Sequence, residues 1–257
     1  MEQKLTITNG GRMTPCILRE PDFGQPKRVV LGVHGIGGSK EDRIQESIAE
    51  EMELFGSVVL RFDFPAHGEN EEEILSLQGC VDTLLDVADY AIGRYPHLQD
   101  LCIFATGFGA YVTMTAMQDL AALPVRVRLV IQTPSLRMDQ TVLNITRVSA
   151  VTLEAMEMVL FKVPKRPLGF FYSFYEECRD NPAFASYPIP MLILHGQYDD
   201  YVPMSDIQLL RDLNDRSKLV IIPGASHHFL EPGAWDMVLD LTRDWFEYEQ
   251  VLLTEAY

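Results

Sequence analysis

A stretch of small residues between a strand-like run and a helix-like run is the first place where this sequence could carry chemistry. The apolar run 101–104 gives way to Ala105, Gly107 and Gly109, and a spacing typical of a helix resumes at Ala110. Small residues here let a strand turn sharply into a helix while the two backbones nearly touch. The pattern matches G-x-S-x-G, the turn that raises a nucleophilic serine for acyl transfer, with Ala105 in place of the first glycine. The serine position is Gly107, so the turn lacks its attacking hydroxyl.

The nearest hydroxyl in the sequence belongs to Thr106, which lies one residue before the tip of the turn. If Thr106 were the nucleophile, the small-residue positions two before and two after it would be Phe104 and Phe108, which breaks the steric logic of the turn. A non-glycine residue at the tip is strained by roughly 1–3 kcal/mol, and glycine removes both the strain and the hydroxyl. We therefore assign Gly107 to the nucleophile position.

The elements that must hold this turn alternate between strands and helices. Runs that predict strands lie at 4–8, 15–18, 28–33, 58–62, 101–104, 127–133, 191–195 and 218–222. Helical spacing covers 39–55, 78–92, the residues from 110 onward, and 234–248. Continuous apolar runs such as 28–33 are typical of parallel strands that are buried on both faces. The alternation predicts an α/β fold with a mostly parallel central sheet and helices on both faces.

This alternation lapses between Ser135 and Pro190. The pattern there is helical over 151–161 and then rich in aromatic residues. We expect residues 136–189 to form a helical lid inserted between core strands of a single domain, 1–257. The aromatic side chains would line an apolar pocket for an acyl chain or an aromatic ring if they face the cleft, or else form the core of the lid itself. They are Phe161, Phe170, Phe171, Phe174 and Tyr175.

Composition limits the classes of partner. The 257 residues carry a formal net charge of −16, which opposes binding to the phosphates of nucleic acids and to anionic membranes. No apolar run reaches membrane-spanning length, and the N-terminus lacks the pattern of a signal peptide. The four cysteines have no C-x-x-C spacing and the six histidines no paired ligand spacing. We expect a reduced, cytoplasmic chain that needs no metal and no cofactor.

Five blocks of sequence carry a resemblance to a known superfamily through their order and spacing. They are HGIGGS at 34–39, FDFPAHGEN at 62–70, the turn at 105–110, HGQYDDYVP at 195–203 and PGASHHF at 223–229. Together they resemble the α/β-hydrolase superfamily, and within it the small esterases of the cinnamoyl/feruloyl and monoacylglycerol-lipase type. The resemblance implies the α/β-hydrolase fold and the hydrolysis of carboxylic esters.

The resemblance also implies roles for individual residues. The backbone amides of Ile36 and Phe108 would form an oxyanion hole. Asp199 falls where the family keeps its triad acid, and His227 matches the family histidine. Such a carboxylate holds the tautomer of the imidazole and stabilises its cation.

Neighbouring residues compete for these roles or have structural ones. Asp200 and His228 directly follow the two assigned residues and are their chief competitors. His34 and His67 lie in turns that are structural in the family, so we interpret them as hydrogen-bonded turn residues. Ala66 stands where the family's D-x-x-G-H-G turn has a glycine.

Gly107 leaves three hypotheses for function. The chain could bind a small apolar or aromatic ester-like ligand without acyl transfer. It could use the Asp199–His227 pair as a general base on water or on a substrate proton, without a covalent intermediate. It could also be a serine esterase that carries a substitution at residue 107. A scaffold that binds a partner through its acidic surface is the fourth, more distant class. The sequence does not fix the oligomeric state or the ester.

Overall fold

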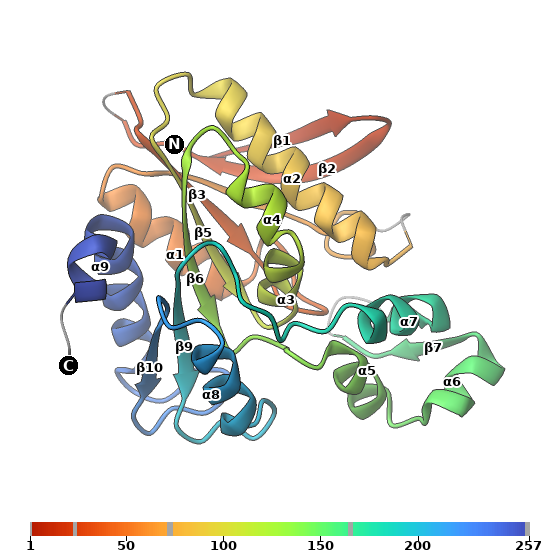
Figure 1. Ribbon diagram of the computed structural model, residues 1–257. Coiled ribbons are helices and arrows are strands. Elements are labelled where there is room, and N and C mark those ends of the chain that lie inside the picture. Colours follow the sequence, from red (N-terminus) through yellow and green to blue (C-terminus); the bar gives the residue numbers. More distant parts are fainter. Residues whose placement is uncertain (1, 23–24, 71–73, 164–166, 255–257) are drawn as a thin grey trace.

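The apolar runs of the sequence form one central sheet. The computed structural model describes residues 2–22, 25–70, 74–163 and 167–254, and within them the sheet has eight strands. In order across the sheet these are β1 (Glu2–Asn9), β2 (Arg12–Arg19), β4 (Val58–Phe62), β3 (Arg28–Val33), β5 (Asp100–Thr106), β6 (Arg126–Gln132), β9 (Met191–Gly196) and β10 (Lys218–Ile222) (Figure 1). Neighbouring strands pair in parallel throughout the series β4, β3, β5, β6, β9 and β10, whereas β2 pairs antiparallel with β1 and with β4. The predicted mostly parallel sheet is confirmed.

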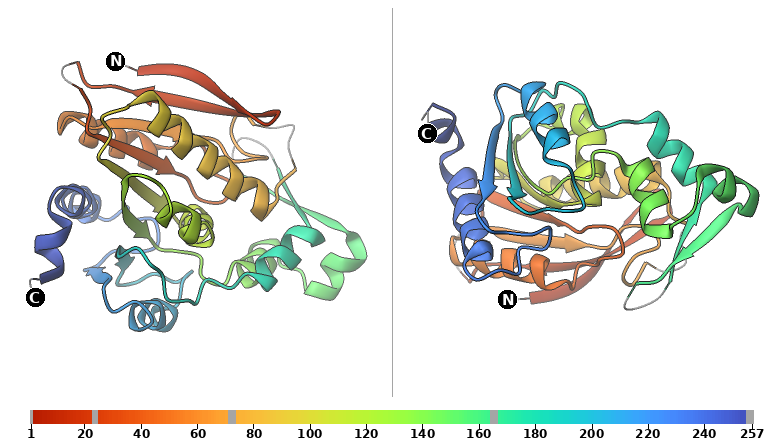
Figure 2. Two further views of the ribbon diagram at one scale, coloured as in Figure 1. Left: turned by 45° about the horizontal axis from the view of Figure 1, so that its top comes forward. Right: turned by 90° about the horizontal axis from the view of Figure 1, so that it is seen from below.

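Helices cover both faces of this sheet. Alternate residues of a strand point to opposite faces, so Val29 and Leu31 of β3 join one apolar cluster and Val30 joins the other. The first cluster is completed by α2 (Leu77–Arg94), α3 (Phe108–Thr115), α4 (Met117–Ala121) and α8 (Met204–Asp212). The second is completed by α1 (Arg43–Leu54) and α9 (Ala234–Thr254), on the face away from α2 (Figure 2). Burial on both faces is the physical reason for the continuous apolar runs.

The segment between β6 and β9 lies beside the central sheet rather than in it (Figure 1). It contains α5 (Met138–Thr146), α6 (Ala150–Met156), β7 (Met158–Phe161), β8 (Leu168–Phe171) and α7 (Tyr172–Asp180). The helix predicted over 151–161 is wrong at its end, because Glu157 has a positive φ of 60° and the next four residues pair with β8. A short apolar run fits a strand or a helix, and pairing with a distant strand decides between them. The lid role of residues 136–189 stays a prediction.

Candidate functional site

The turn between β5 and α3 has the backbone geometry that its sequence pattern predicts. β5 ends at Thr106, α3 begins at Phe108, and Gly107 between them has φ 49° and ψ −110°. Glycine adopts this positive φ readily, whereas other residues are strained there. A Cβ added at Gly109 would lie 2.5 Å from the carbonyl oxygen of His34. A residue without a side chain is therefore required where α3 packs against the end of β3.

Residue 107 itself has room for a side chain. Among the described residues, a Cβ built on Gly107 would meet one heavy atom within 4 Å, the Oγ of Ser135, at an ordinary contact distance of 3.7 Å. The amide of Gly107 donates to the carbonyl of Gln132 (3.0 Å), and its carbonyl accepts from the amide of Ser135 (3.1 Å). We name this turn, residues 105–109, the elbow. These two bonds tie the elbow to the residues at the end of β6 and just after it. Sequence reasoning missed Ser135, because this contact joins the ends of two strands that are distant in the chain.

Asp199 and His227 are brought together as the resemblance predicted. The Nδ1 of His227 lies 2.8 Å from Oδ2 of Asp199, whose side chain is fully buried. The other carboxylate oxygen accepts hydrogen bonds from the amides of Tyr201 (2.8 Å) and Val202 (2.9 Å). Burial alone would raise the pKa of Asp199, but the hydrogen bonds from His227 and the two amides outweigh it and hold the pKa below its ordinary value.

This arrangement fixes the tautomer of His227. The ionised carboxylate accepts a hydrogen bond, so Nδ1 of His227 carries the proton and Nε2 presents its lone pair. Among the described residues Nε2 has no hydrogen-bond partner. An imidazole held in this way can take a proton from a hydroxyl group or a water molecule.

The competing residues do not form a second pair. Asp200 and His228 are exposed, and the His228 ring lies edge-on against the His227 ring with centroids 5.0 Å apart. A buried residue that the sequence did not single out, His195 of β9, places its Nδ1 3.7 Å from Oδ2 of Asp199. Burial is the main cause that lowers the pKa of His195. His195 and Asp199 both lie in the motif HGQYDD, and this spacing was the signal in the sequence that could have indicated their contact.

The amides proposed for an oxyanion hole lie at the start of α3 and in the turn after β3. Phe108 is the first residue of α3, so its amide has no acceptor within the helix. In the turn, the amide of Gly37 donates to Nε2 of His67 (3.0 Å) and that of Gly38 to the carbonyl of Gly35 (3.1 Å). The amides of Ile36 and Phe108 have no acceptor among the described residues. Both remain available to an incoming oxygen atom.

Two histidines hold this turn from inside. Nε2 of His34 accepts from the amide of Phe64 (3.1 Å), and its Nδ1 lies 2.8 Å from the carbonyl of Gly35. His67 accepts from the turn through Nε2 and places its Nδ1 2.8 Å from the carbonyl of Pro65. Both rings are therefore neutral with the proton on Nδ1, and both are hydrogen-bonded turn residues. Burial is the main cause that lowers the pKa of His34.

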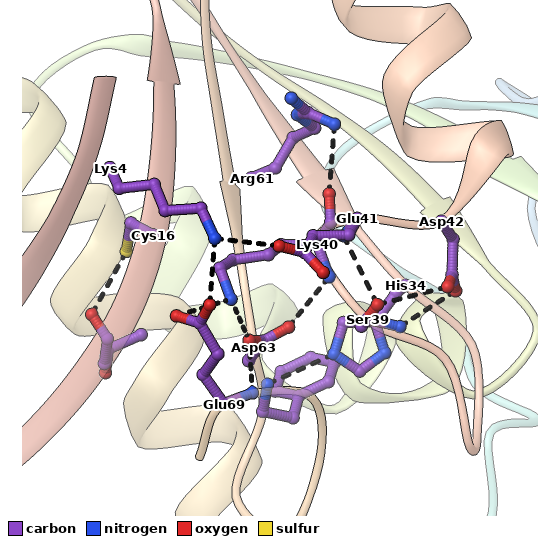
Figure 3. Close-up of polar contacts among 12 residues, drawn as sticks. Lys4, Cys16, His34, Ser39, Lys40, Glu41, Asp42, Arg61, Asp63 and Glu69 are labelled. Carbon is purple, nitrogen blue, oxygen red and sulfur yellow. Dashed lines mark hydrogen bonds and ion pairs between the residues drawn. The ribbon is translucent and has the colours of Figure 1, made fainter. Parts of the chain in front are cut away.

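A buried ion pair also links the turn after β3 to the turn after β4 (Figure 3). The ammonium group of Lys40 contacts Oδ2 of Asp63, and both side chains are almost completely buried. The amide of Lys40 donates to Oδ1 of the same carboxylate (2.8 Å), and the amide of Glu69 donates to Oδ2 (2.9 Å). The sequence predicted a helix from residue 39, but α1 begins at Arg43. The carboxylate of Asp42 instead accepts from the amide of Ser39 (2.8 Å) in the preceding turn.

Two of the five predicted pocket residues form an aromatic core between the elbow and the segment 136–189. Phe170 and Phe174 are fully buried and stack on each other with centroids 5.9 Å apart. Phe174 also packs edge-on against Phe108, 5.9 Å away. The sequence left two alternatives for these residues, the lining of a pocket or a core of the segment itself. Phe170 and Phe174 form such a core.

The other three predicted residues differ in position. Phe161 and Phe171 are half-buried, and Tyr175 is buried and stacks on Tyr172. A Cβ added at Gly37 would lie 4.0 Å from the Phe161 ring and 2.5 Å from Cγ1 of Val163. The end of β7 therefore lies over the turn that contains Ile36. Of the five residues, Phe161 is the one that this contact places beside the site.

In the part of the chain that the structure describes, no three His, Cys, Asp or Glu side chains are grouped as a metal site requires. No helix there is long and apolar enough to cross a membrane. All four cysteines are buried, and none forms a disulfide within the described residues.

Comparisons with known proteins agree with the geometry. No curated protein sequence matches the chain at a significant level. Among solved structures, ferulic-acid-bound Est1E from Butyrivibrio proteoclasticus is 19% identical with a TM-score of 0.81, and the match covers 96% of this chain and 99% of that one. The esterase domain of a Rhodothermus marinus protein is 17% identical with a TM-score of 0.71, covering 95% and 97%. Dienelactone hydrolase from Anabaena variabilis is 21% identical with a TM-score of 0.66, covering 96% and 97%.

These structural likenesses have low identity and establish the fold. The sequence itself matches the model of the alpha/beta hydrolase family over residues 30–240, most of its length. The turn after β5, the Asp199–His227 pair after β9 and β10, and nearly all of the parallel strands that carry them lie in that range. The chain belongs to the alpha/beta hydrolase family.

Proposed function

We propose that this site binds the carbonyl group of a small apolar or aromatic carboxylic ester and that Asp199 and His227 act there as a general base. The observation that carries the proposal is the 2.8 Å hydrogen bond between the two side chains. The carboxylate is fully buried and its second oxygen is held by two amides, so the imidazole has one defined orientation. A positioned general base contributes roughly 10²–10⁴-fold to a rate.

The proposed position of the ester oxygen is between the amides of Ile36 and Phe108. Negative charge that develops on this oxygen is stabilised by donors that are already oriented, and the N-terminus of α3 adds its partial positive charge. The support is that neither amide has an acceptor among the described residues. The buried contacts of His34, His67 and Lys40 with the neighbouring turn keep the first amide in place.

In this proposal no acyl group is transferred to residue 107. Gly107 has no side chain, so the usual covalent intermediate of the family cannot form there. His227 is left to activate another hydroxyl group or a water molecule. Carboxylic-ester hydrolysis by the route normal for the family is lost or impaired.

The nature of the ligand is proposed from the surroundings of the site. Phe161 lies beside the turn that carries Ile36, and the segment 136–189 supplies further aromatic residues. Est1E, which shares the fold, has ferulic acid bound, an aromatic carboxylic acid. The net charge of −16 supports a partner that is neither nucleic acid nor an anionic membrane. Four cysteines that form no disulfide within the described residues support a cytoplasmic location.

A second candidate function is binding of the same class of ligand without catalysis. The observation that favours it is Gly107, because loss of the hydroxyl removes the usual chemistry while leaving the rest of the site in place.

Hydrolysis of p-nitrophenyl acetate and butyrate separates the two candidates. We expect slow hydrolysis by the native chain, reduced roughly 10²-fold in His227→Ala because the general base is lost. His228→Ala is the matched control, since this neighbouring ring is exposed and does not contact Asp199 through a hydrogen bond. Equal rates for the native chain and His227→Ala would reject the general base. Saturable binding of the ester under those conditions would establish the binding function instead.

A further inference from the structure

The turn that follows β6 is strained in a way that the elbow is not. Thr133 has a φ of 42°, in the left-handed region, and it is 3% exposed. A β-branched residue in this region is a genuine outlier, and such strain is concentrated at functional sites. The amide of Thr133 donates to the carbonyl of Leu194 in β9 (2.9 Å), which holds the strained residue in place. The unstrained glycine at residue 107 and the strained threonine at residue 133 are on adjacent strand ends.

This turn delivers the hydroxyl of Ser135 to the elbow. The amide of Ser135 donates to the carbonyl of Gly107 (3.1 Å), and its Oγ lies 3.7 Å from the position of a Cβ at that residue. The residue is 8% exposed, and its hydroxyl has no hydrogen-bond partner among the described residues. A hydroxyl in contact with the place where the family's nucleophile would branch from the backbone is thus present, although it comes from a different strand.

The topology places this hydroxyl on the side of the elbow that leads to the base. β6 lies between β5 and β9 in the sheet, so the turn after β6 lies between the elbow and the turn that carries Asp199. The Nε2 of His227 has no partner among the described residues and presents its lone pair. The turn that carries the Ser135 hydroxyl therefore neighbours the turn that carries Asp199, the carboxylate that holds this base.

The geometry points to Ser135 as the nucleophilic hydroxyl of this site, a role that rests on the ester-binding function proposed above. Its Oγ forms a bond to the carbonyl carbon of the ester while its proton passes to Nε2 of His227. The carbonyl electron pair moves onto the oxygen atom beside the amides of Ile36 and Phe108. When the carbonyl re-forms, the bond to the alkoxy group breaks and His227 returns the proton to it, releasing an alcohol. A water molecule then bonds to the acyl carbon while His227 takes its proton; the bond to Ser135 Oγ breaks, His227 returns the proton to Oγ, and a carboxylic acid is released.

A fluorophosphonate probe tests this assignment because it forms a stable adduct with an activated serine. The purified chain is incubated with the probe, and the adduct is located by intact mass and peptide mapping. We expect one adduct, on Ser135, that is absent in Ser135→Ala and forms roughly 10²-fold more slowly in His227→Ala, because the base is lost. Ser186→Ala is the matched control, since Ser186 also lies between β6 and β9 but is exposed, and its loss should leave labelling unchanged.

The double variant Gly107→Ser/Ser135→Ala distinguishes failure of this inference from failure of the proposed function. An adduct on residue 107 in the double variant, with none on Ser135 in the native chain, would refute the role of Ser135 and leave the ester site intact. An adduct on Thr106 or on an exposed serine in the native chain would also refute it. Absence of any adduct in both proteins, each shown to be folded by circular dichroism, would refute both proposals.

Discussion

Replacing Gly107 by serine places a hydroxyl at the tip of the elbow without a steric clash. The added Cβ meets Ser135 Oγ at 3.7 Å, an ordinary contact, so the cost comes from the backbone rather than from packing. Residue 107 has φ 49° and ψ −110°, and a non-glycine residue in such a conformation is destabilised by roughly 1–3 kcal/mol. In a chain of this size each kcal/mol lowers the melting temperature by about 2–4 °C.

The gain in activity follows from the residues already in place. Loss of a triad serine in a protease costs up to about 2 × 10⁶ in kcat, and the oxyanion hole and binding alone retain roughly 10³–10⁴ over water. If His227 and the two amides are in register with the new hydroxyl, Gly107→Ser should raise hydrolysis of p-nitrophenyl butyrate by at least about 10³-fold when both chains also carry Ser135→Ala, which removes the other candidate nucleophile.

Gly107→Ala is the matched control, because it introduces the same strain without a hydroxyl. Both variants should lose stability to a similar extent in urea denaturation, and the serine variant alone should gain activity. Gly107→Ser/His227→Ala should lose the gain. A folded Gly107→Ser protein that remains inert on a broad panel of esters would show that the base and the elbow are out of register. It would also contradict the hypothesis that the chain is a serine esterase with a substitution at residue 107.

Two further predictions concern the residues that hold the site. Lys40→Met leaves the Asp63 carboxylate buried without its cation and should lower the free energy of unfolding by roughly 3–5 kcal/mol. The double variant Lys40→Met/Asp63→Asn should recover much of this loss. A loss below about 1 kcal/mol for Lys40→Met in urea denaturation would contradict the importance of the pair. Burial lowers the pKa of His34 and His195 in the folded chain below the usual 6.5, so the unfolded chain binds more protons and stability should fall as the pH drops below about 6.5. His195→Gln should show a smaller loss of stability between pH 7 and pH 5 than the native chain, and an unchanged loss would remove His195 as a cause.

The sheet and the elbow could be predicted from the sequence because their patterns are local. A strand buried on both faces must be apolar throughout, as 28–33 is. An elbow in which the helix touches the preceding strand requires small residues, and Gly109 has no room for a side chain. The Asp199–His227 pair was located because each residue lies in a motif that follows a predicted strand.

Features that depend on contacts between distant segments could not be predicted. Met158 to Phe161 form a strand because they pair with Leu168 to Phe171, and the apolar run alone fits a helix equally well. The approach of Ser135 to Gly107 depends on β6 being the neighbour of β5, which the order of strands along the chain does not specify. The ion pair between Lys40 and Asp63 could not be predicted either, because the two residues lie in turns that follow different strands.

The internal bonds of the turn after β3 have a consequence for how this lineage can change. His34, His67 and Lys40 hold that turn against the residues after β4, and their bonds do not involve the tip of the elbow. The shape of the turn after β3 therefore does not depend on which residue occupies position 107. Glycine and serine codons can differ by a single base, so one mutational step separates a chain with a serine at the elbow from one without it. The bonds that hold the turn after β3 are the same on either side of that step.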